Sequence, residues 1–284
     1  MDSLQTKKDF VIYVVVIMCN PNGGIDNGGA PRNDYDGYGI ISDVCIKRKL
    51  RNRMQDLGYD IFVKSEGRQD DGFLCLRDRA KQLENFGNSD EFAKQACGKW
   101  LDVRSFGQLF AFKDDKDKGG KGISKGIRGP VSVQIGMSVD PVEIVTMDIT
   151  KSTNSESSDG KRDSDTIGKK SFVRFGLYRI AGSINTQLSE STGFCEEDAE
   201  VIKKCLQSLF DNDASAARPE GSMEVVKMYW FDHGCKDGRY PSGKVQRSVT
   251  AKLKDGVDVP RSINDYEFGV TPLEGIKMEE YSSI

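Results

Sequence analysis

The sequence of 284 residues contains a single histidine, His233, and none of its seven cysteines forms a Cys-x-x-Cys pair. Ser-His, Cys-His and multi-histidine metal mechanisms would therefore all have to pass through one side chain. His233 follows an apolar run in the segment Asp-His-Gly-Cys, where we expect a structural histidine in a turn. The scattered, odd-numbered cysteines indicate reduced thiols and argue against a disulfide framework and a structural zinc site. We expect no cofactor and no metal.

The chain also lacks an apolar run long enough to cross a bilayer. Residues 10–19 form an apolar run of ten residues that ends in Asn-Pro-Asn-Gly-Gly, which is not a signal-peptide cleavage site. The valine, isoleucine and tyrosine content of this run favours a strand that is buried on both faces. We therefore expect a cytoplasmic protein that does not contact membranes.

An excess of positive charge is absent as well, because the formal net charge is -3 and the pI is near 5.5. This charge argues against a generic basic nucleic-acid binder, and any nucleic-acid site must be a local stripe. The lysine- and glycine-rich residues 113–126 lack the Gly-x-x-x-x-Gly-Lys-Ser/Thr spacing of a phosphate loop. The segment Asp34-Tyr35-Asp36-Gly37 is a fragment of a calcium loop without its distal glutamate.

Positive charge is concentrated in residues 41–53, Ile-Ser-Asp-Val-Cys-Ile-Lys-Arg-Lys-Leu-Arg-Asn-Arg, which we predict to be helical. Ser42 is suited to cap the start of this helix, and Gly58 is suited to its C-terminal end. Apolar residues recur at helical spacing and predict one narrow buried face. They are Ile46, Leu50, Met54 and Leu57.

Five lysines and arginines occupy seven positions of this helix, at 47, 48, 49, 51 and 53, and no acid lies among them. Like charges one turn apart destabilise a helix unless an anion balances them. One interpretation is an ordinary solvated basic face. The working hypothesis is that the phosphate backbone of a nucleic acid lies along the helix.

The remaining patterns predict a mixed α+β chain. We predict strands at residues 10–19, 59–63, 103–112, 130–139, 142–149, 171–185, 223–231, 245–253 and 266–270, and further helices at 74–83, 89–101 and 196–210. The strongest elements give the order βαββαβ, which is that of a ferredoxin-like or RNA-recognition fold. Residues 60–102 and 143–170 exceed ordinary connection lengths and are expected to be functional projections.

Two groups of residues allow more than one interpretation. Phe106, Phe110 and Phe112 alternate along the strand predicted at 103–112, which indicates core packing first and base stacking second. Acids near the basic helix, such as Asp26, are candidates for cleaving RNA, alone or through a metal. However, carboxylates in loops rich in glycine and asparagine commonly form turns. The sequence favours binding over catalysis.

Several segments match one protein family in the same order and at comparable spacing. They are Asn20-Pro21-Asn22-Gly23, Pro31-Arg32, and residues 40–49, 102–107, 127–131, 175–178 and 215–218. On these segments the chain resembles the backbone subunit of type I CRISPR Cascade complexes, the "Cas seven" family, and it is closest to the type I-C branch.

The resemblance implies a hand-shaped protein. Its RNA-recognition-like palm would comprise residues 1–59, 103–142 and 171–284, with a helical finger insertion at 60–102 and a thumb hairpin at 143–170. The resemblance further implies a non-catalytic subunit whose copies polymerise along a CRISPR guide RNA and present segments of it for pairing with target DNA in antiviral defence. The implied partners are the guide RNA, the target DNA strand, neighbouring copies and other Cascade subunits.

Carried over residue by residue, the resemblance implies one RNA-binding track. Its residues are Asn20, Asn22, Gly23, Arg32, Ser42, Lys47, Arg48, Arg51, Arg104, Phe106, Arg128, Lys169 and Lys170. The chain departs from the family pattern in several places: Gly24 stands where an acid is common, Lys169 where arginine is common, and Ala214 and Pro219 flank the segment 215–218. Lys169 keeps a point charge for a phosphate without the arginine fork.

Two rival functions stay open at this stage. One is a backbone-type endoribonuclease, like the related subunit of type III complexes, that cuts complementary RNA with a loop aspartate such as Asp26. The other is a stand-alone RNA-recognition-like module that never assembles into an array. Regularly spaced cuts in complementary RNA would indicate the first, and copies at variable spacing on a long RNA would indicate the second.

Overall fold

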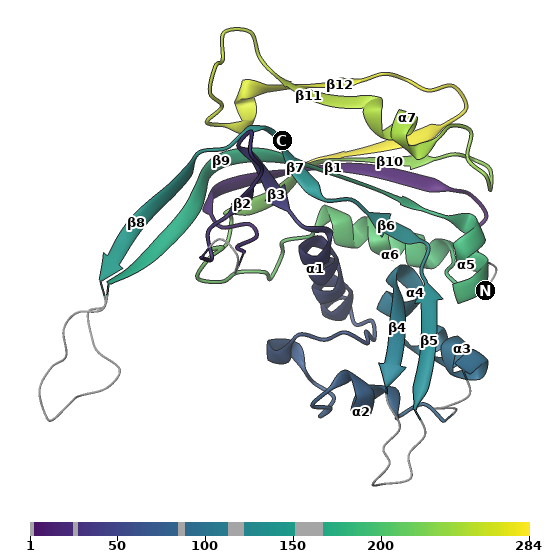
Figure 1. The fold of residues 1–284 in the computed structure, drawn as a ribbon. Coiled ribbons are helices and arrows are strands. Elements are labelled where there is room, and N and C mark those ends of the chain that lie inside the picture. Colours follow the sequence, from purple (N-terminus) through teal and green to yellow (C-terminus); the bar gives the residue numbers. More distant parts are fainter. Residues whose placement is uncertain (1–2, 25–27, 85–88, 113–121, 151–166) are drawn as a thin grey trace, which may run out of the picture.

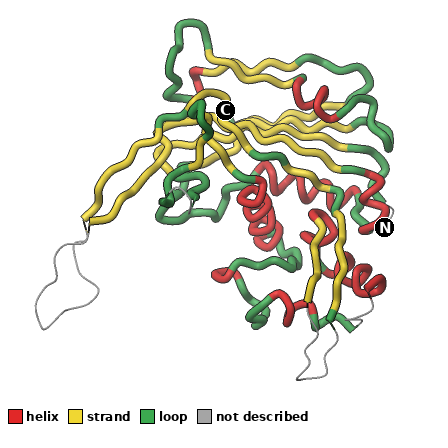
Figure 2. Tube along the Cα trace, in the orientation of Figure 1, coloured by secondary structure: helices red, strands yellow, loops and turns green. Residues whose placement is uncertain are grey.

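The computed structural model describes residues 3–24, 28–84, 89–112, 122–150 and 167–284. A large antiparallel sheet forms its centre (Figure 1). Helices α1 (Asp43–Asp56) and α6 (Glu196–Gln207) pack on one face of the sheet, and the strand pair β11 (Val249–Leu253) and β12 (Tyr266–Val270) covers the other. Figure 2 shows that most helical residues lie on the α1 side.

Within the described residues the main sheet has nine strands, all paired antiparallel. Seven follow the order β13-β10-β1-β9-β7-β3-β2, and β6 and β8 also pair with β9. The bounds are β1 Lys8–Cys19, β2 Arg32–Asn33, β3 Tyr38–Ile41, β6 Val131–Val133, β7 Gly136–Pro141, β8 Ile144–Thr150, β9 Ile167–Ile184, β10 Met223–Asp232 and β13 Lys277–Ser282. Beyond the sheet, β8 and β9 continue together as a projecting arm (Figure 1).

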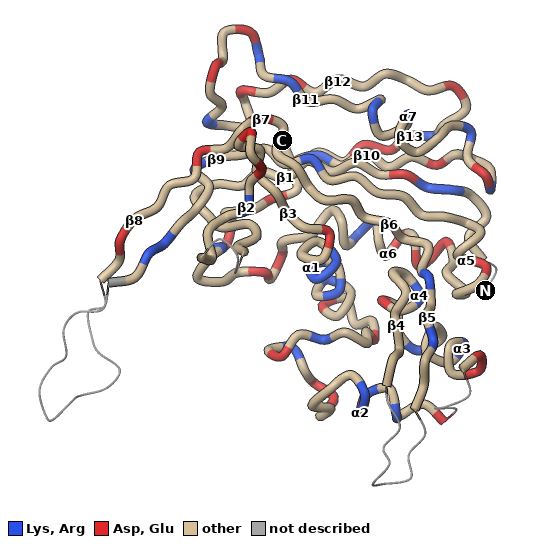
Figure 3. Tube along the Cα trace, in the orientation of Figure 1, with Lys and Arg blue, Asp and Glu red and all other residues tan. Residues whose placement is uncertain are grey.

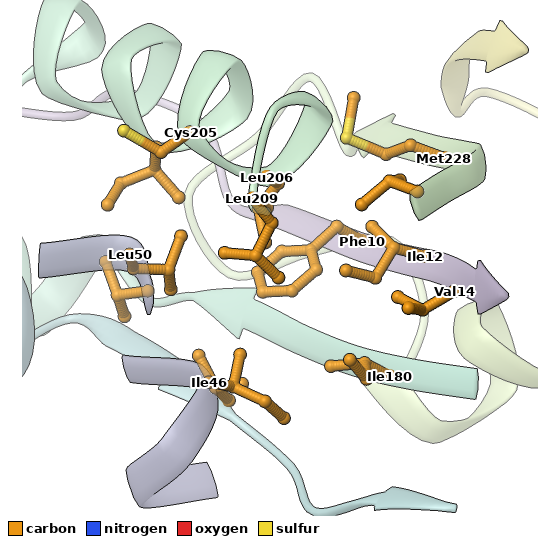
Figure 4. Close-up of a cluster of buried hydrophobic side chains, with 14 of the residues drawn as sticks. Phe10, Ile12, Val14, Ile46, Leu50, Ile180, Cys205, Leu206, Leu209 and Met228 are labelled. Atoms are coloured by element: carbon orange, nitrogen blue, oxygen red, sulfur yellow. The ribbon is translucent and has the colours of Figure 1, made fainter. Parts of the chain in front are cut away.

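Strand β1 supplies side chains to two separate cores, because successive residues of a strand point to opposite faces. Phe10 and Ile12 point toward α1 and α6, where Leu50 joins them in the first core (Figure 4). Val11 and Tyr13 point to the second core beneath β11 and β12. The prediction of a strand buried on both faces is confirmed.

A side lobe lies next to α1 and has a third core of its own, which includes Phe62, Phe92, Trp100 and Phe110. Its elements are α2 Leu76–Ala80, α3 Ser89–Lys99, α4 Leu101–Phe106 and the strand pair β4 Gly107–Phe112 and β5 Ile123–Arg128. The remaining elements of the chain are α5 Thr186–Thr192, α7 Ser242–Arg247 and the short 3-10 turns Glu66–Arg68 and Ile263–Asp265. In the described part of the chain, no helix has the length and apolar character needed to span a bilayer.

The helices predicted at residues 41–53, 89–101 and 196–210 are confirmed as α1, α3 and α6, and α1 extends three residues further, to Asp56. The strand predicted at 59–63 is wrong. Ile61 is buried in the first core and the next residue, Phe62, in the third, so the chain bends between two cores. Leu57, assigned to the buried face of α1, is 43% exposed.

The strand predicted at 103–112 is wrong in its first half, where α4 runs to Phe106. Gly107 then adopts a φ of +77°, a conformation that favours glycine, and the chain turns into β4. Strand β5 begins at Ile123, within the lysine- and glycine-rich segment 113–126, where the glycines and charges favour a loop, and residues 113–121 lie outside the described part. Residues 151–166 of the predicted thumb lie outside it as well.

Candidate nucleic-acid interface

The start of α1 joins three segments that are far apart in the sequence. Ser42 caps the helix as predicted, because its Oγ accepts a hydrogen bond from the Cys45 N–H at 3.2 Å. The Ser42 N–H donates to Asn22 Oδ1 at 2.8 Å. In the loop before β10, the Ala217 carbonyl accepts the N–H of Asn20 at 2.9 Å. The matching segments around residues 20–23, 42–45 and 215–218 therefore meet at one place.

The loop after β1 is folded back on itself. Asn20 Nδ2 donates to the Gly29 carbonyl at 2.6 Å, and Gly23 forms a β-bridge with Pro31. A Cβ on Gly23 would lie 2.6 Å from the Gly29 oxygen, so this close approach requires glycine. Gly23 is itself exposed, which leaves its backbone accessible beside the start of α1.

All five cations of α1 have partners within their own chain. Arg48 Nη1 donates to the Val63 carbonyl at 2.6 Å, and burial lowers the pKa of this guanidinium. The other four cations form ion pairs. These are Lys47–Asp43 at 3.0 Å, Lys49–Asp213 at 2.5 Å, Arg51–Asp102 at 2.8 Å and Arg53–Asp56 at 2.9 Å.

The expectation that these charges are unbalanced without an external anion is wrong. Asp43 precedes Lys47 by one helical turn, and Asp102 and Asp213 reach the helix from distant parts of the chain. Figure 3 shows the acidic and basic positions close together around α1. A contact of RNA with Lys47, Arg48 or Arg51 stays a prediction.

Phe106 lies beside α1, at the last position of α4 rather than on a strand. The Arg51 guanidinium is 5.1 Å from the centroid of the Phe106 ring, and the ring packs partly buried against the first core. Phe110 is fully buried in the third core. The alternation predicted for Phe106, Phe110 and Phe112 along one strand is wrong, since only the last two lie on β4.

Arg104 is held by a bidentate ion pair. Its Nε and Nη2 each donate to the Asp198 carboxylate at 2.8 Å, and its Nη1 donates to the Cys97 carbonyl at 2.6 Å. The side chain is 18% exposed. Arg104 therefore fastens α4 to α6, and a contact of its guanidinium with RNA stays a prediction.

The matching segments 102–107 and 127–131 are in close backbone contact where the chain leaves the side lobe, and Gly107 pairs with Arg128. A Cβ on Gly107 would lie 2.2 Å from the Ile127 oxygen, and one on Gly129 would lie 2.3 Å from the Ser105 oxygen. Both positions therefore require glycine. Between them, Arg128 is exposed, and its side chain has no hydrogen bond or ion pair to a residue that the structure describes.

The other predicted RNA-binding residues are placed elsewhere. Lys169 and Lys170 are exposed on β9 in the projecting arm, opposite Asp148 and Met147 of β8 and away from α1 (Figure 3). Arg32 is half-buried on β2, at the edge of the sheet. The structure does not bring the two lysines to the start of α1, whereas Arg32 pairs with Ile40, two residues before the Ser42 cap.

The single histidine directly follows strand β10. His233 is fully buried, with Nε2 2.7 Å from Asp9 Oδ2, and its Nδ1 accepts the Arg239 N–H at 3.0 Å. Nε2 therefore carries the proton. Among the described residues no group of three or more His, Cys, Asp or Glu side chains is placed to hold a metal. Asp26, the aspartate of the nuclease alternative, lies outside the described part.

These observations define a mixed α/β protein with an antiparallel sheet, a projecting arm and a separate side lobe. Comparison with known protein families identifies the family to which it belongs. The profile of the family described as CRISPR-associated protein Cas7 matches residues 6–271, and the chain belongs to this family. The resemblance stated from the sequence motifs is thereby confirmed, and the type I-C branch stays a prediction.

The chain is similar to the CRISPR-associated protein Cas7 of Haloferax volcanii, with 28% identity over 274 residues, which cover 90% of this chain and 78% of that one. Two solved structures also contain chains similar to this one, and each shares 15% identity with this chain over 80% of its length. One, from a "CRISPR RNA-guided surveillance complex, pre-nicking", has a TM-score of 0.47 and is covered to 78%. The other, from a "CRISPR RNA-guided surveillance complex", has a TM-score of 0.45 and is covered to 69%.

Proposed function

We propose that this chain is a non-catalytic backbone subunit of a type I, I-C-like CRISPR complex, whose copies polymerise along the guide RNA in the cytoplasm. Membership in the Cas7 family over residues 6–271 carries the proposal. In the proposed complex, the exposed guide segments pair with target DNA, and other Cascade subunits complete the assembly. Such a protein binds the RNA backbone and leaves sequence recognition to base pairing.

A ferredoxin-like palm is part of this proposal. The elements β1, α1, β7, β9, α6 and β10 follow the order βαββαβ, and the sheet places the four strands as β10-β1-β9-β7. In this assignment the β8–β9 arm is the thumb and the side lobe is the finger. The finger would extend to β5 rather than end at residue 102, because Phe110 and Ile123 are buried in the core of that lobe.

The start of α1 is the place best suited to a guide phosphate. Helix N-termini favour anions through their free N–H groups and the helix dipole. Here the Ser42 N–H donates a hydrogen bond to Asn22 Oδ1, and this contact places the accessible backbone of Gly23 next to Ser42. Lys49 and Arg218 share the single carboxylate of Asp213, at 2.5 and 3.2 Å, so this corner keeps an excess of positive charge.

The test mixes the full chain with a guide RNA long enough for several copies. Native mass spectrometry should give one copy number for each RNA length, and nuclease footprinting should show contiguous protection. Copies at variable spacing would support a stand-alone RNA-binding module instead. Regular cuts in complementary RNA with Mg²⁺, abolished by Asp26→Ala, would support the endoribonuclease.

A further inference from the structure

A cavity of about 550 Å³ lies on the face of the sheet opposite α1, between the sheet and β11. Strands β1, β7 and β9 form its floor, and residues from the end of α7 to β11 form its other wall. Cavities of about 300–1,000 Å³ are typical of small-molecule sites. None of the residues in the proposed RNA track lines it.

The lining carries positive charge and no acid. Arg179, Arg247 and Lys252 line the cavity, and no aspartate or glutamate is among its described lining residues. Arg179 is fixed in place by the 2.7 Å hydrogen bond from its Nη2 to the Gln246 carbonyl. Glu267 lies opposite Lys252 in the β11–β12 register but does not line the cavity. Cations collected around a concave site favour an anionic ligand.

The hydroxyl of Tyr13 adds an independent sign of a ligand. Tyr13 is fully buried and lines the cavity, and its hydroxyl lies beside the Arg179 guanidinium, which can donate a hydrogen bond to it but cannot accept one. Burial raises the pKa of Tyr13, while the charge of Arg179 and its hydrogen bond to the hydroxyl oppose this shift, so the hydroxyl keeps its proton at pH 7. No described residue accepts that proton in a hydrogen bond, and a ligand oxygen would do so.

The remaining lining is largely apolar. Ile135, Met137 and Val139 come from the sheet side, and Val249 comes from β11. Apolar walls of this kind accept a flat heterocycle, whereas a simple inorganic anion gains nothing from them. The ligand therefore has two parts, one strongly anionic and one apolar or aromatic.

We propose that this cavity binds a nucleoside phosphate. Arg179, Arg247 and Lys252 hold the phosphate, the Tyr13 hydroxyl donates to an oxygen of the ligand, and the base packs on Met137 and Val139. The ligand is either a free nucleotide or the terminal nucleotide of a strand, because both present the same chemistry. The site lies on the other face of the sheet from α1 and is separate from guide-RNA binding.

Isothermal titration calorimetry on the full chain tests this, with AMP, inorganic phosphate and a 5′-phosphorylated oligoadenylate as probes. AMP should bind, Arg247→Gln should weaken it about tenfold, and Tyr13→Phe about threefold. Arg247 is exposed and Tyr13→Phe keeps the ring, so both variants should stay folded. Lys254→Gln, an exposed lysine outside the cavity lining, is the matched control and should bind AMP like the parent.

Tighter binding of the oligoadenylate through the same residues would identify a strand end as the source, and binding of AMP alone would identify a free nucleotide. Failure of AMP to bind at millimolar concentration, or binding unaffected by both variants, would overturn the proposal. Equal affinity for inorganic phosphate and AMP would show that the cavity does not recognise the nucleoside, and would overturn that part of the proposal. Array formation on guide RNA should be unchanged in Arg247→Gln, which distinguishes this site from the proposed function.

Discussion

Arg51 on α1 donates from its Nε to Oδ2 of Asp102 at 2.8 Å, and this carboxylate is fully buried at the start of α4. The same carboxylate accepts the backbone N–H groups of Phe62 and Val63 at 2.6 and 3.1 Å. One acid thus joins the basic helix, the segment that leads into the side lobe, and the helix that leads out of it.

Asp102→Asn should therefore lower the free energy of unfolding by about 3–5 kcal/mol. The substitution leaves the Arg51 guanidinium without its counter-charge and removes one side-chain oxygen that accepts hydrogen bonds. Urea unfolding measures this change. Asp43→Asn is the matched control, since Asp43 pairs with Lys47 on the surface and its removal should cost less than about 1 kcal/mol. Equal effects of the two substitutions would contradict the assignment of Asp102 as the junction.

Arg104→Gln should destabilise the protein by about 2–4 kcal/mol, because it breaks the bidentate pair with Asp198. Asp198→Asn should have a similar effect, and the double variant should lose less than the sum of the two. Urea unfolding of the three variants gives the coupling free energy. If Arg104→Gln kept its stability but bound guide RNA more weakly, Arg104 would be an RNA-binding residue instead.

Gly39→Ala should lower the free energy of unfolding by about 1–3 kcal/mol through overpacking. A Cβ at Gly39 would lie 2.1 Å from the Tyr178 hydroxyl, which is fully buried beneath it. Gly98→Ala is the contrasting variant. It lies in α3 with open space around the new Cβ, and it should stabilise the protein by about 0.5–1 kcal/mol. Loss of stability in both variants would show that the close approach at Gly39 is not the cause.

Low pH should reduce the stability that the ion pair of Asp71 with Arg79 gives to the side lobe. The bidentate contact with Arg79, at 2.7 and 2.9 Å, holds the pKa of this carboxyl well below its usual range. A lowered folded-state pKa stabilises the protein fully above the unfolded value of about 3.9, and this stability is lost as the pH falls toward the folded value. Asp71→Asn should thus be less stable than the parent at pH 7, with the difference shrinking below about pH 4.

Urea midpoints measured from neutral to acid pH check this. Exposed Asp258, replaced by Asn, provides the control and should follow the parent at every pH. A difference between Asp71→Asn and the parent that stayed constant below pH 4 would mean that the ionised pair with Arg79 is not its source.

Replacing Arg128, Lys169 and Lys170 together by glutamine should weaken guide-RNA binding regardless of sequence. It should also reduce the salt slope of binding by about 0.7 for each phosphate of a single strand that the variant no longer neutralises. All three side chains are exposed, so the free energy of unfolding should barely change. Fluorescence anisotropy at several salt concentrations measures the slope, with Lys254→Gln as control. An unchanged slope would remove these residues from the RNA track.

The long and strongly patterned elements of the fold were predictable from the sequence. Strand β1 is apolar from Phe10 to Cys19, and α1 and α6 have a repeating apolar face, so local pattern and final burial agree. The start of α4 was not predictable, because Val103 and Phe106 also suit a strand until Gly107 turns the chain. The short strand β2, with two residues, carries too little pattern to detect.

The cap at Ser42 was predictable because capping is local. The charge balance of α1 was not, because Asp102 and Asp213 are separated from their partners by 51 and 164 residues. The pair of Asp43 with Lys47 is local, because the two residues are one helical turn apart in the sequence. Sequence motifs gave the family, while the roles of Arg51 and Arg104 in packing required three-dimensional contacts.

The two places where the chain enters and leaves the side lobe determine where its sequence can change in length. The chain enters the lobe near Asp60, whose carbonyl accepts the Leu101 N–H at 2.9 Å, and it leaves where Gly107 and Gly129 are in close backbone contact. Because both ends of the lobe are held and it has a hydrophobic core of its own, we expect insertions and deletions in its loops to leave the strand register of the main sheet unchanged. Engineers seeking to graft a loop or a reporter onto this scaffold should begin there.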